Sequence, residues 1–162
     1  MILIGLGSNL SSQAGPPRAT LMAALAELGR RGVTIVSRSR FFRSAAWPDP
    51  SAPPFVNAVA LIETALEPRA LLKLLHEVEA KFGRKRGRPN APRTLDLDIL
   101  DYEGKVEDGP PALPHPRLDD RLFVLMPLRD VAAHWRHPVS GRTVDELIRS
   151  ATPVQVESLP TD

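Results

Sequence analysis

The chain has 162 residues, and its 43% hydrophobic and 25% charged content is that of an ordinary soluble globular protein, expected to form one domain over 1–162. A net charge of +2 does not indicate nucleic-acid binding, and the absence of cysteine excludes disulfides and thiolate metal ligands. The sequence has no apolar run of membrane-spanning length and no signal-peptide pattern, so we expect a cytoplasmic protein with no nucleic-acid or membrane partner.

The first 66 residues predict the order strand, helix, strand, strand. Residues 1–7 form an apolar run typical of a buried strand. Residues 17–30 carry leucine and alanine at helical spacing, behind two prolines that suit a first helical turn. Residues 33–43 and 55–66 are rich in β-branched and aromatic side chains, which favours two more strands.

Two side chains in this half of the chain are candidates for ligand contact. Trp47 lies in a proline-rich connection over 44–54, where it either covers a ligand or folds back onto the core. Asn57 is a polar residue on an apolar strand and shares one face with Phe55. A buried amide needs hydrogen-bond partners, so Asn57 either bridges backbone groups or recognises the edge of a heterocycle.

A second helix is predicted over 68–82, and a strongly basic loop follows it. Glu79 lies beside the apolar stripe of this helix, where it can pair with an arginine of the loop or contact a substrate. The loop, residues 84–93, holds five basic residues and no acidic one, and its glycine and two prolines predict an irregular backbone. Taken alone, this loop is also compatible with a solvated run of charge.

The strand after the loop carries a pair of carboxylates. Leu95, Leu97 and Ile99 alternate with Asp96 and Asp98, which is the period of a strand. The two aspartates therefore share one face, roughly 6–7 Å apart at the backbone. Such a pair is costly to desolvate, and divalent cations would remove that cost, although an edge strand that displays two aspartates to solvent is an alternative. The aspartate pair and the basic loop together favour a ligand made of a metal ion and a polyphosphate.

The order of elements predicts the fold class. Strand, helix, strand, strand, helix, strand is the ferredoxin-like βαββαβ plan, an α+β fold whose antiparallel sheet carries both helices on one face. The last third of the chain is expected to be irregular, with short helices over 126–133 and 145–150 and an edge strand over 154–159.

Several motifs follow one another along the chain: Gly5-Leu6-Gly7-Ser8-Asn9-Leu10, Phe42-Arg43-Ser44, Phe55-Val56-Asn57-Ala58, the segment 92–99, and Pro114-His115-Pro116-Arg117 with Arg121 and Phe123. In these motifs and their order the chain resembles the 6-hydroxymethyl-7,8-dihydropterin pyrophosphokinases of folate biosynthesis. The resemblance implies a ferredoxin-like fold with three long mobile loops. It also implies transfer of the pyrophosphoryl group of ATP to the hydroxymethyl group of the dihydropterin, with release of AMP. We expect a monomer whose partners are these two small molecules.

The resemblance further implies roles for individual residues. Asp96 and Asp98 would bind two magnesium ions that bridge the ATP phosphates, and they form the catalytic set with Arg84 and Arg93. The residues implied to contact ATP are Glu79, Arg84, Arg86, Arg93, Ile99 through its backbone, His115 and Arg121. Those implied to contact the pterin are Ser44, Ala45 and Trp47 through their backbone, Asn57 at the ring edge, and Phe55 and Phe123 on the two ring faces.

Two other functions use the same features. A two-metal phosphohydrolase or nuclease would employ the same aspartates without an acceptor substrate. An RNA-binding ferredoxin-like module would array aromatic side chains on its central strands. This chain has one tyrosine and five phenylalanines, and it places acidic residues on the key strand, which disfavours the RNA-binding alternative.

Overall fold

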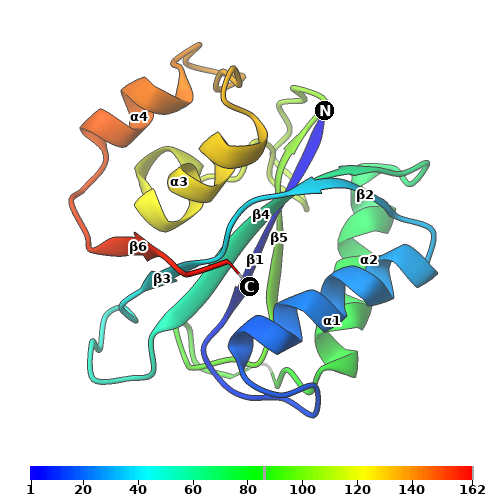
Figure 1. Ribbon diagram of the computed structural model, residues 1–162. Helices are drawn as coiled ribbons and strands as arrows, with labels where there is room; N and C mark the ends of the chain where they lie inside the picture. Colours follow the sequence, from blue (N-terminus) through cyan, green and yellow to red (C-terminus); the bar gives the residue numbers. More distant parts are fainter. Residues whose placement is uncertain (86, 162) are drawn as a thin grey trace.

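The computed structural model describes residues 1–85 and 87–161. Over these residues the chain forms one six-stranded sheet, with α1 and α2 on one face and α3 and α4 on the other (Figure 1). The strands are β1 (Ile2–Ser8), β2 (Thr34–Arg38), β3 (Phe42–Ser44), β4 (Phe55–Glu63), β5 (Asp96–Tyr102) and β6 (Val156–Ser158). The helices are α1 (Pro17–Arg30), α2 (Pro68–Lys81), α3 (Leu122–Val131) and α4 (Val144–Ser150), with a 3-10 turn η1 (Leu118–Asp120).

The strand order is β5-β1-β4-β3-β6, with β2 also paired to β4, and the pairings are antiparallel. Helices α1 and α2 each begin with a proline at the first position, where its missing N–H costs nothing. The expected α+β class with a βαββαβ core is confirmed, since β2 and β3 together take the place of the second strand of that plan.

The single strand expected over 33–43 is split in two. Between β2 and β3 the side chain of Ser39 accepts a hydrogen bond from the backbone N–H of Val59 at 2.9 Å. The backbone N–H of Arg40 donates to Asp130 at 2.9 Å. Side chains thus take over backbone groups that a continuous ladder would have paired, and the strand is interrupted there.

The last third is more regular than expected. Helix α3 begins at Leu122, ahead of the predicted 126, and tolerates Pro127 inside it. Helix α4 starts with a capping box in which Thr143 and Glu146 satisfy each other's backbone N–H groups. The expected edge strand is present as β6, shortened to three residues.

Two apolar cores lie on the two faces of the sheet. Alternation along β4 sends Ala60 and Ile62 toward α1 and α2, and Val59 toward α3 and α4. Burying both faces stabilises the sheet, and the cavity described next lies on the α3 side, where the core residues Leu100 and Leu118 form part of its lining. No helix among the described residues is both long and apolar enough to cross a membrane.

Candidate active site

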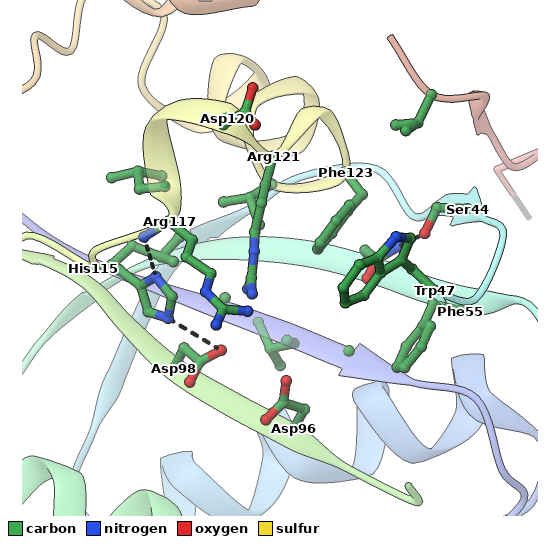
Figure 2. Close-up of a pocket in the computed structure, with 18 of the residues that line it drawn as sticks. Ser44, Trp47, Phe55, Asp96, Asp98, His115, Arg117, Asp120, Arg121 and Phe123 are labelled. Atoms are coloured by element: carbon green, nitrogen blue, oxygen red, sulfur yellow. Dashed lines mark hydrogen bonds and ion pairs between the residues drawn. The ribbon is translucent and has the colours of Figure 1, made fainter. Parts of the chain in front are cut away.

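A large cavity of about 760 Å³ lies between the sheet and the η1–α3 segment. We call it the main cavity. A smaller hollow of about 340 Å³, the basic hollow, opens beside it and is lined by the loop after α2. The two share a junction formed by Asn90, Arg93, Asp96, Asp98, His115, Arg117 and Arg121. Figure 2 shows the charged groups gathered at one end of the main cavity and three aromatic rings at the other.

The C-terminal half of β1 forms the floor of the main cavity. Gly7 pairs with Asn57 of β4 on one side and with Asp96 of β5 on the other. A Cβ atom at Gly7 would lie 3.4 Å from Asn57 Oδ1 and 4.0 Å from Asp96 Cβ. The missing side chain therefore leaves open the space between the polar groups of the two flanking strands.

Asp96 and Asp98 both line the main cavity, so the expected shared face is confirmed. Burial, followed by repulsion from Asp96 and Glu79, raises the pKa of Asp98 to about 7, and water in the cavity moderates this effect because 38% of the side chain is exposed. Keeping both carboxylates ionised is therefore costly, and a bound cation would lower that cost.

This donor set fits magnesium. Mg²⁺ usually takes one or two carboxylates and completes its shell with phosphate oxygens and water. Among the described residues no group of three or more His, Asp or Glu side chains is placed to hold a metal. A cation bound by Asp96 and Asp98 would therefore take its remaining ligands from a polyphosphate and from water.

Beneath β5, Arg84 links the two acidic side chains Glu79 and Asp96. Its Nη1 donates to Asp96 Oδ1 at 2.8 Å and also to Glu79 Oε2. Glu79 is 2% exposed, and its Oε2 also accepts the backbone N–H of Leu97 at 2.8 Å. Glu79 thus holds both the arginine and the strand that carries the aspartates, which is the loop pairing that the sequence allowed for.

Asn9 connects three segments around the cavity. Its Oδ1 accepts the backbone N–H of Arg93 at 2.8 Å, and its Nδ2 donates to Pro53 O at 3.1 Å. The backbone N–H groups of Asn9 and Leu10 donate to Arg93 O at 3.1 and 3.2 Å. The end of β1 therefore anchors Arg93 and the connection before β4, a role that motif spacing alone did not reveal.

His115 faces Asp98 across the junction, with 3.9 Å between Nε2 and Oδ2 (Figure 2). Burial, with help from the nearby charge of Arg121, lowers the pKa of His115 to about 4, so the ring is neutral at pH 7. Its Nδ1 accepts the backbone N–H of Arg117 at 3.2 Å. The ring proton is therefore assigned to Nε2, the nitrogen directed at Asp98.

Arg117 belongs to this junction although we assigned it no role from the sequence. It lines both the main cavity and the basic hollow, and Figure 2 shows its guanidinium pointing into the cavity. Within residues 1–85 and 87–161 this guanidinium has neither a hydrogen bond nor an ion pair. The available signal was its place in the Pro-His-Pro-Arg motif.

The other end of the main cavity is aromatic. Phe55, Phe123 and Trp47 line it together with Ser44 and its neighbour Ala45, and Figure 2 shows the three rings gathered there. Trp47 is 70% exposed, so it does not cover the core.

Asn57 lies at the base of this aromatic end and is 6% exposed. Its Nδ2 donates to Ser44 Oγ at 2.8 Å. This hydrogen bond fixes the plane of the amide between β3 and β4 and orients it before any ligand is bound.

The expected site residues thus fall into three groups. Most line one or both hollows, namely Ser44, Ala45, Trp47, Phe55, Asn57, Arg84, Arg93, Asp96, Asp98, His115, Arg121 and Phe123. Glu79 and Ile99 line neither: Glu79 is buried below β5, and the Ile99 side chain packs in the α1–α2 core. Arg86 lies outside the described residues.

Comparisons of sequence agree with this geometry. Residues 3–133 match the family model described as 7,8-dihydro-6-hydroxymethylpterin-pyrophosphokinase (HPPK). Three relatives named 2-amino-4-hydroxy-6-hydroxymethyldihydropteridine pyrophosphokinase are similar over most of their length. That of Pseudomonas aeruginosa is 38% identical, covering 98% of this chain and 96% of its own. That of Methylorubrum extorquens is 37% identical (95% and 95%), and that of Synechocystis sp. 38% (90% and 73%).

Solved structures share the fold at low sequence identity. An HPPK-DHPS structure in complex with substrates superposes with a TM-score of 0.66 at 11% identity, over 92% of this chain. A Plasmodium falciparum HPPK-DHPS triple mutant with pteroate gives a TM-score of 0.68 at 11% identity, over 91% of this chain. This chain spans 42% of the length of each of those two chains.

Proposed function

The chain belongs to the 7,8-dihydro-6-hydroxymethylpterin-pyrophosphokinase family, and we infer that it transfers the pyrophosphoryl group of ATP to the hydroxymethyl group of 6-hydroxymethyl-7,8-dihydropterin. The products are AMP and the dihydropterin diphosphate, in a step of folate biosynthesis. The observation that carries this function is the position of Asp96 and Asp98 between an aromatic cavity end and a basic hollow.

The two ends of the cavity suit the two substrates. Phe55 and Phe123 offer faces for a flat heterocycle, and Asn57 offers an oriented amide for its edge. Arg84, Arg93 and Arg121 supply cations for a triphosphate. The hydroxymethyl group of a pterin at the aromatic end would then meet the phosphates at the junction, which is where the aspartates lie.

In the transfer, the hydroxymethyl oxygen bonds to the β-phosphorus of ATP, and the bond from that phosphorus to the oxygen bridging to the α-phosphate breaks. AMP leaves with this oxygen, and the hydroxyl proton passes to solvent. Negative charge builds up on the oxygens around the transferred group, and arginines already in place stabilise it without reorganising. We assign that role to Arg84, held by Glu79, and to Arg93, held by Asn9.

We propose that magnesium takes part, with two ions held by Asp96 and Asp98. When bound, the ions would neutralise phosphate charge and favour loss of the hydroxyl proton. Ile99 lies on β5, an edge strand of the sheet, where its backbone would contact the adenine. We further propose that the protein acts as a monomer in the cytoplasm, on small molecules alone.

A nucleotide product assay tests this function. The protein is incubated with ATP, MgCl₂ and 6-hydroxymethyl-7,8-dihydropterin, and the nucleotides are separated and identified. We expect AMP in amounts equal to the pterin diphosphate, and none without pterin. ADP as the product, or phosphate release that does not need pterin, would contradict the proposal, and the second result would instead support a phosphohydrolase.

A further inference from the structure

The main cavity has one wall that comes from outside the family match. Thr152, Val154 and Gln155 line it, whereas the family model ends at residue 133. These residues lie between α4 and β6, and we call residues 152–158 the C-terminal strap. The strap runs from the end of α4 to the β3 edge of the sheet, where β6 pairs with β3 (Figure 1).

At its start the strap is tied to η1 through Asp120. The backbone N–H of Thr152 donates to Asp120 Oδ1 at 2.8 Å. The Thr152 hydroxyl lies 3.1 Å from Oδ1 and 3.0 Å from Oδ2 of the same carboxylate. Asp120 ends η1 and directly precedes Arg121, with Phe123 two residues further on (Figure 2). The strap therefore holds the turn that comes just before Phe123, one of the aromatic side chains of the cavity.

At its other end the strap is tied to β3. Val156 pairs with Ser44 in the antiparallel β3–β6 ladder. Beyond the strap, the backbone N–H of Leu159 donates to Phe41 O at 2.8 Å, and Arg18 Nη1 donates to Pro160 O at 2.8 Å. Ser44 accepts the hydrogen bond that orients the Asn57 amide. This end of the strap therefore supports β3, whose Ser44 orients Asn57 at the aromatic end of the cavity.

We propose that the C-terminal strap is a positioning element for the pterin substrate, with Thr152 and Asp120 as positioning residues and Val154 as part of the pocket wall; this rests on the proposed function. A flat ring held between two side chains needs a fixed separation of the walls, and small misplacement of a bound reactant slows reaction steeply. The strap bridges the two walls outside the charged junction. Because Thr152 and Asp120 line the main cavity but not the basic hollow, we expect the strap to act on pterin binding more than on ATP binding.

Matched variants at Thr152 test the tie to η1. Thr152→Val keeps the shape and the backbone N–H but removes the hydroxyl donor, while Thr152→Ser keeps the hydroxyl. Losing one hydrogen bond of this kind should raise the KM for dihydropterin about three- to tenfold. We expect kcat and the KM for ATP to change less than the KM for dihydropterin, because Thr152 and Asp120 line the main cavity but not the basic hollow. Thr152→Ser should restore the wild-type KM for dihydropterin.

Val154 tests the wall itself, with Val139 as its control. Both are exposed apolar residues in the C-terminal third, at 51% and 66% exposure, but among the two only Val154 lines the main cavity. Val154→Ala should raise the KM for dihydropterin about twofold to threefold, because a partly exposed side chain contributes limited apolar contact. Val139→Ala should leave all three kinetic constants unchanged.

The outcomes separate this inference from the proposed function. A selective rise in the pterin KM, reversed by Thr152→Ser, supports the strap as a positioning element. Two results with an active wild type would overturn the strap proposal alone. In one, the variants have unchanged kinetic constants; in the other, they show a lower kcat, higher KM values for both substrates and a lower Tm. Absence of pterin-dependent AMP from the wild type would overturn the proposed function and the strap proposal with it.

Discussion

Glu27 and Asp98 are acidic side chains on opposite faces of one sheet, and their surroundings move their pKa values in opposite directions. Glu27 on α1 lies 2.7 Å from Lys81 Nζ and also pairs with Arg30 and Arg31. The Lys81 hydrogen bond, with the two arginines, lowers the pKa of Glu27 to about 2. Burial beside other carboxylates raises that of Asp98 to about 7.

The difference distinguishes charged side chains that stabilise the fold from charged side chains that are available to bind a ligand. Between α1 and α2, each carboxylate has its cations within the chain. At the cavity junction, Asp98 has no lysine or arginine ion-pair partner among the described residues, and Arg117 has no acidic one. A magnesium–triphosphate complex would satisfy both, because it brings cations to the aspartates and anions to the arginines.

The strongest test of this division is removal of either junction aspartate. Asp96→Ala and Asp98→Ala should each reduce kcat by roughly 10²–10³-fold, since each removes a proposed ligand of the magnesium ions. The melting temperature should not fall for Asp98→Ala, because repulsion is relieved. Asp145→Ala, which removes a surface partner of Arg129, is the control and should keep full activity. Near-normal turnover in either junction variant would show that the metal ligands are wrongly assigned.

The next effect is expected at Glu79, which lies below β5. Glu79→Gln keeps the shape of the side chain but removes the negative charge that pairs with Arg84. Arg84 should then pair more closely with Asp96. We expect kcat to fall about 10–100-fold, as when groups that orient metal ligands are changed. Glu77→Gln, two residues earlier on α2 and 50% exposed, is the matched control. If the two variants have equal activity, Glu79 belongs with the structural charges rather than with the site.

Phe123 tests the uncharged end of the cavity. Phe123→Ala should raise the KM for dihydropterin about tenfold, because it removes one stacking face and the apolar contact behind it. The KM for ATP should change far less. Steady-state kinetics with each substrate varied in turn measures both constants. Equal changes in the two constants would argue against stacking on Phe123.

The smallest effect should come from the helix face. Because folding lowers the pKa of Glu27, its ion pairs add stability above the unfolded pKa of about 4.5, and this stability is lost as the pH falls toward about 2. Glu27→Gln should therefore melt a few degrees below the wild type at pH 7, with a gap that closes between about pH 4.5 and 2. Activity at pH 7 should be unchanged. Thermal melts at several pH values measure this, and a gap that does not vary with pH would contradict the assignment.

The fold could be predicted from the sequence because its signals are local, whereas most of the candidate site residues were named through the family resemblance. Helix α1 has the expected bounds, 17–30, since leucine spacing and a leading proline are written within one segment. The side chain of Trp47 was ambiguous because its exposure depends on packing. The interruption of the strand over 33–43 was missed because it depends on Asp130, 90 positions beyond Arg40.

The sequence by itself determined that Asp96 and Asp98 share one face, because a period of two residues forces this on any strand. Only the tertiary structure decided what surrounds them. Asn9 and Arg93 are 84 positions apart in the sequence, and Asp120 and Thr152 are 32 positions apart, yet each pair is in contact. No periodicity encodes such contacts, since they form only when the elements pack. The pairing of Arg84 with both Glu79 and Asp96, and the raised pKa of Asp98, follow from that packing.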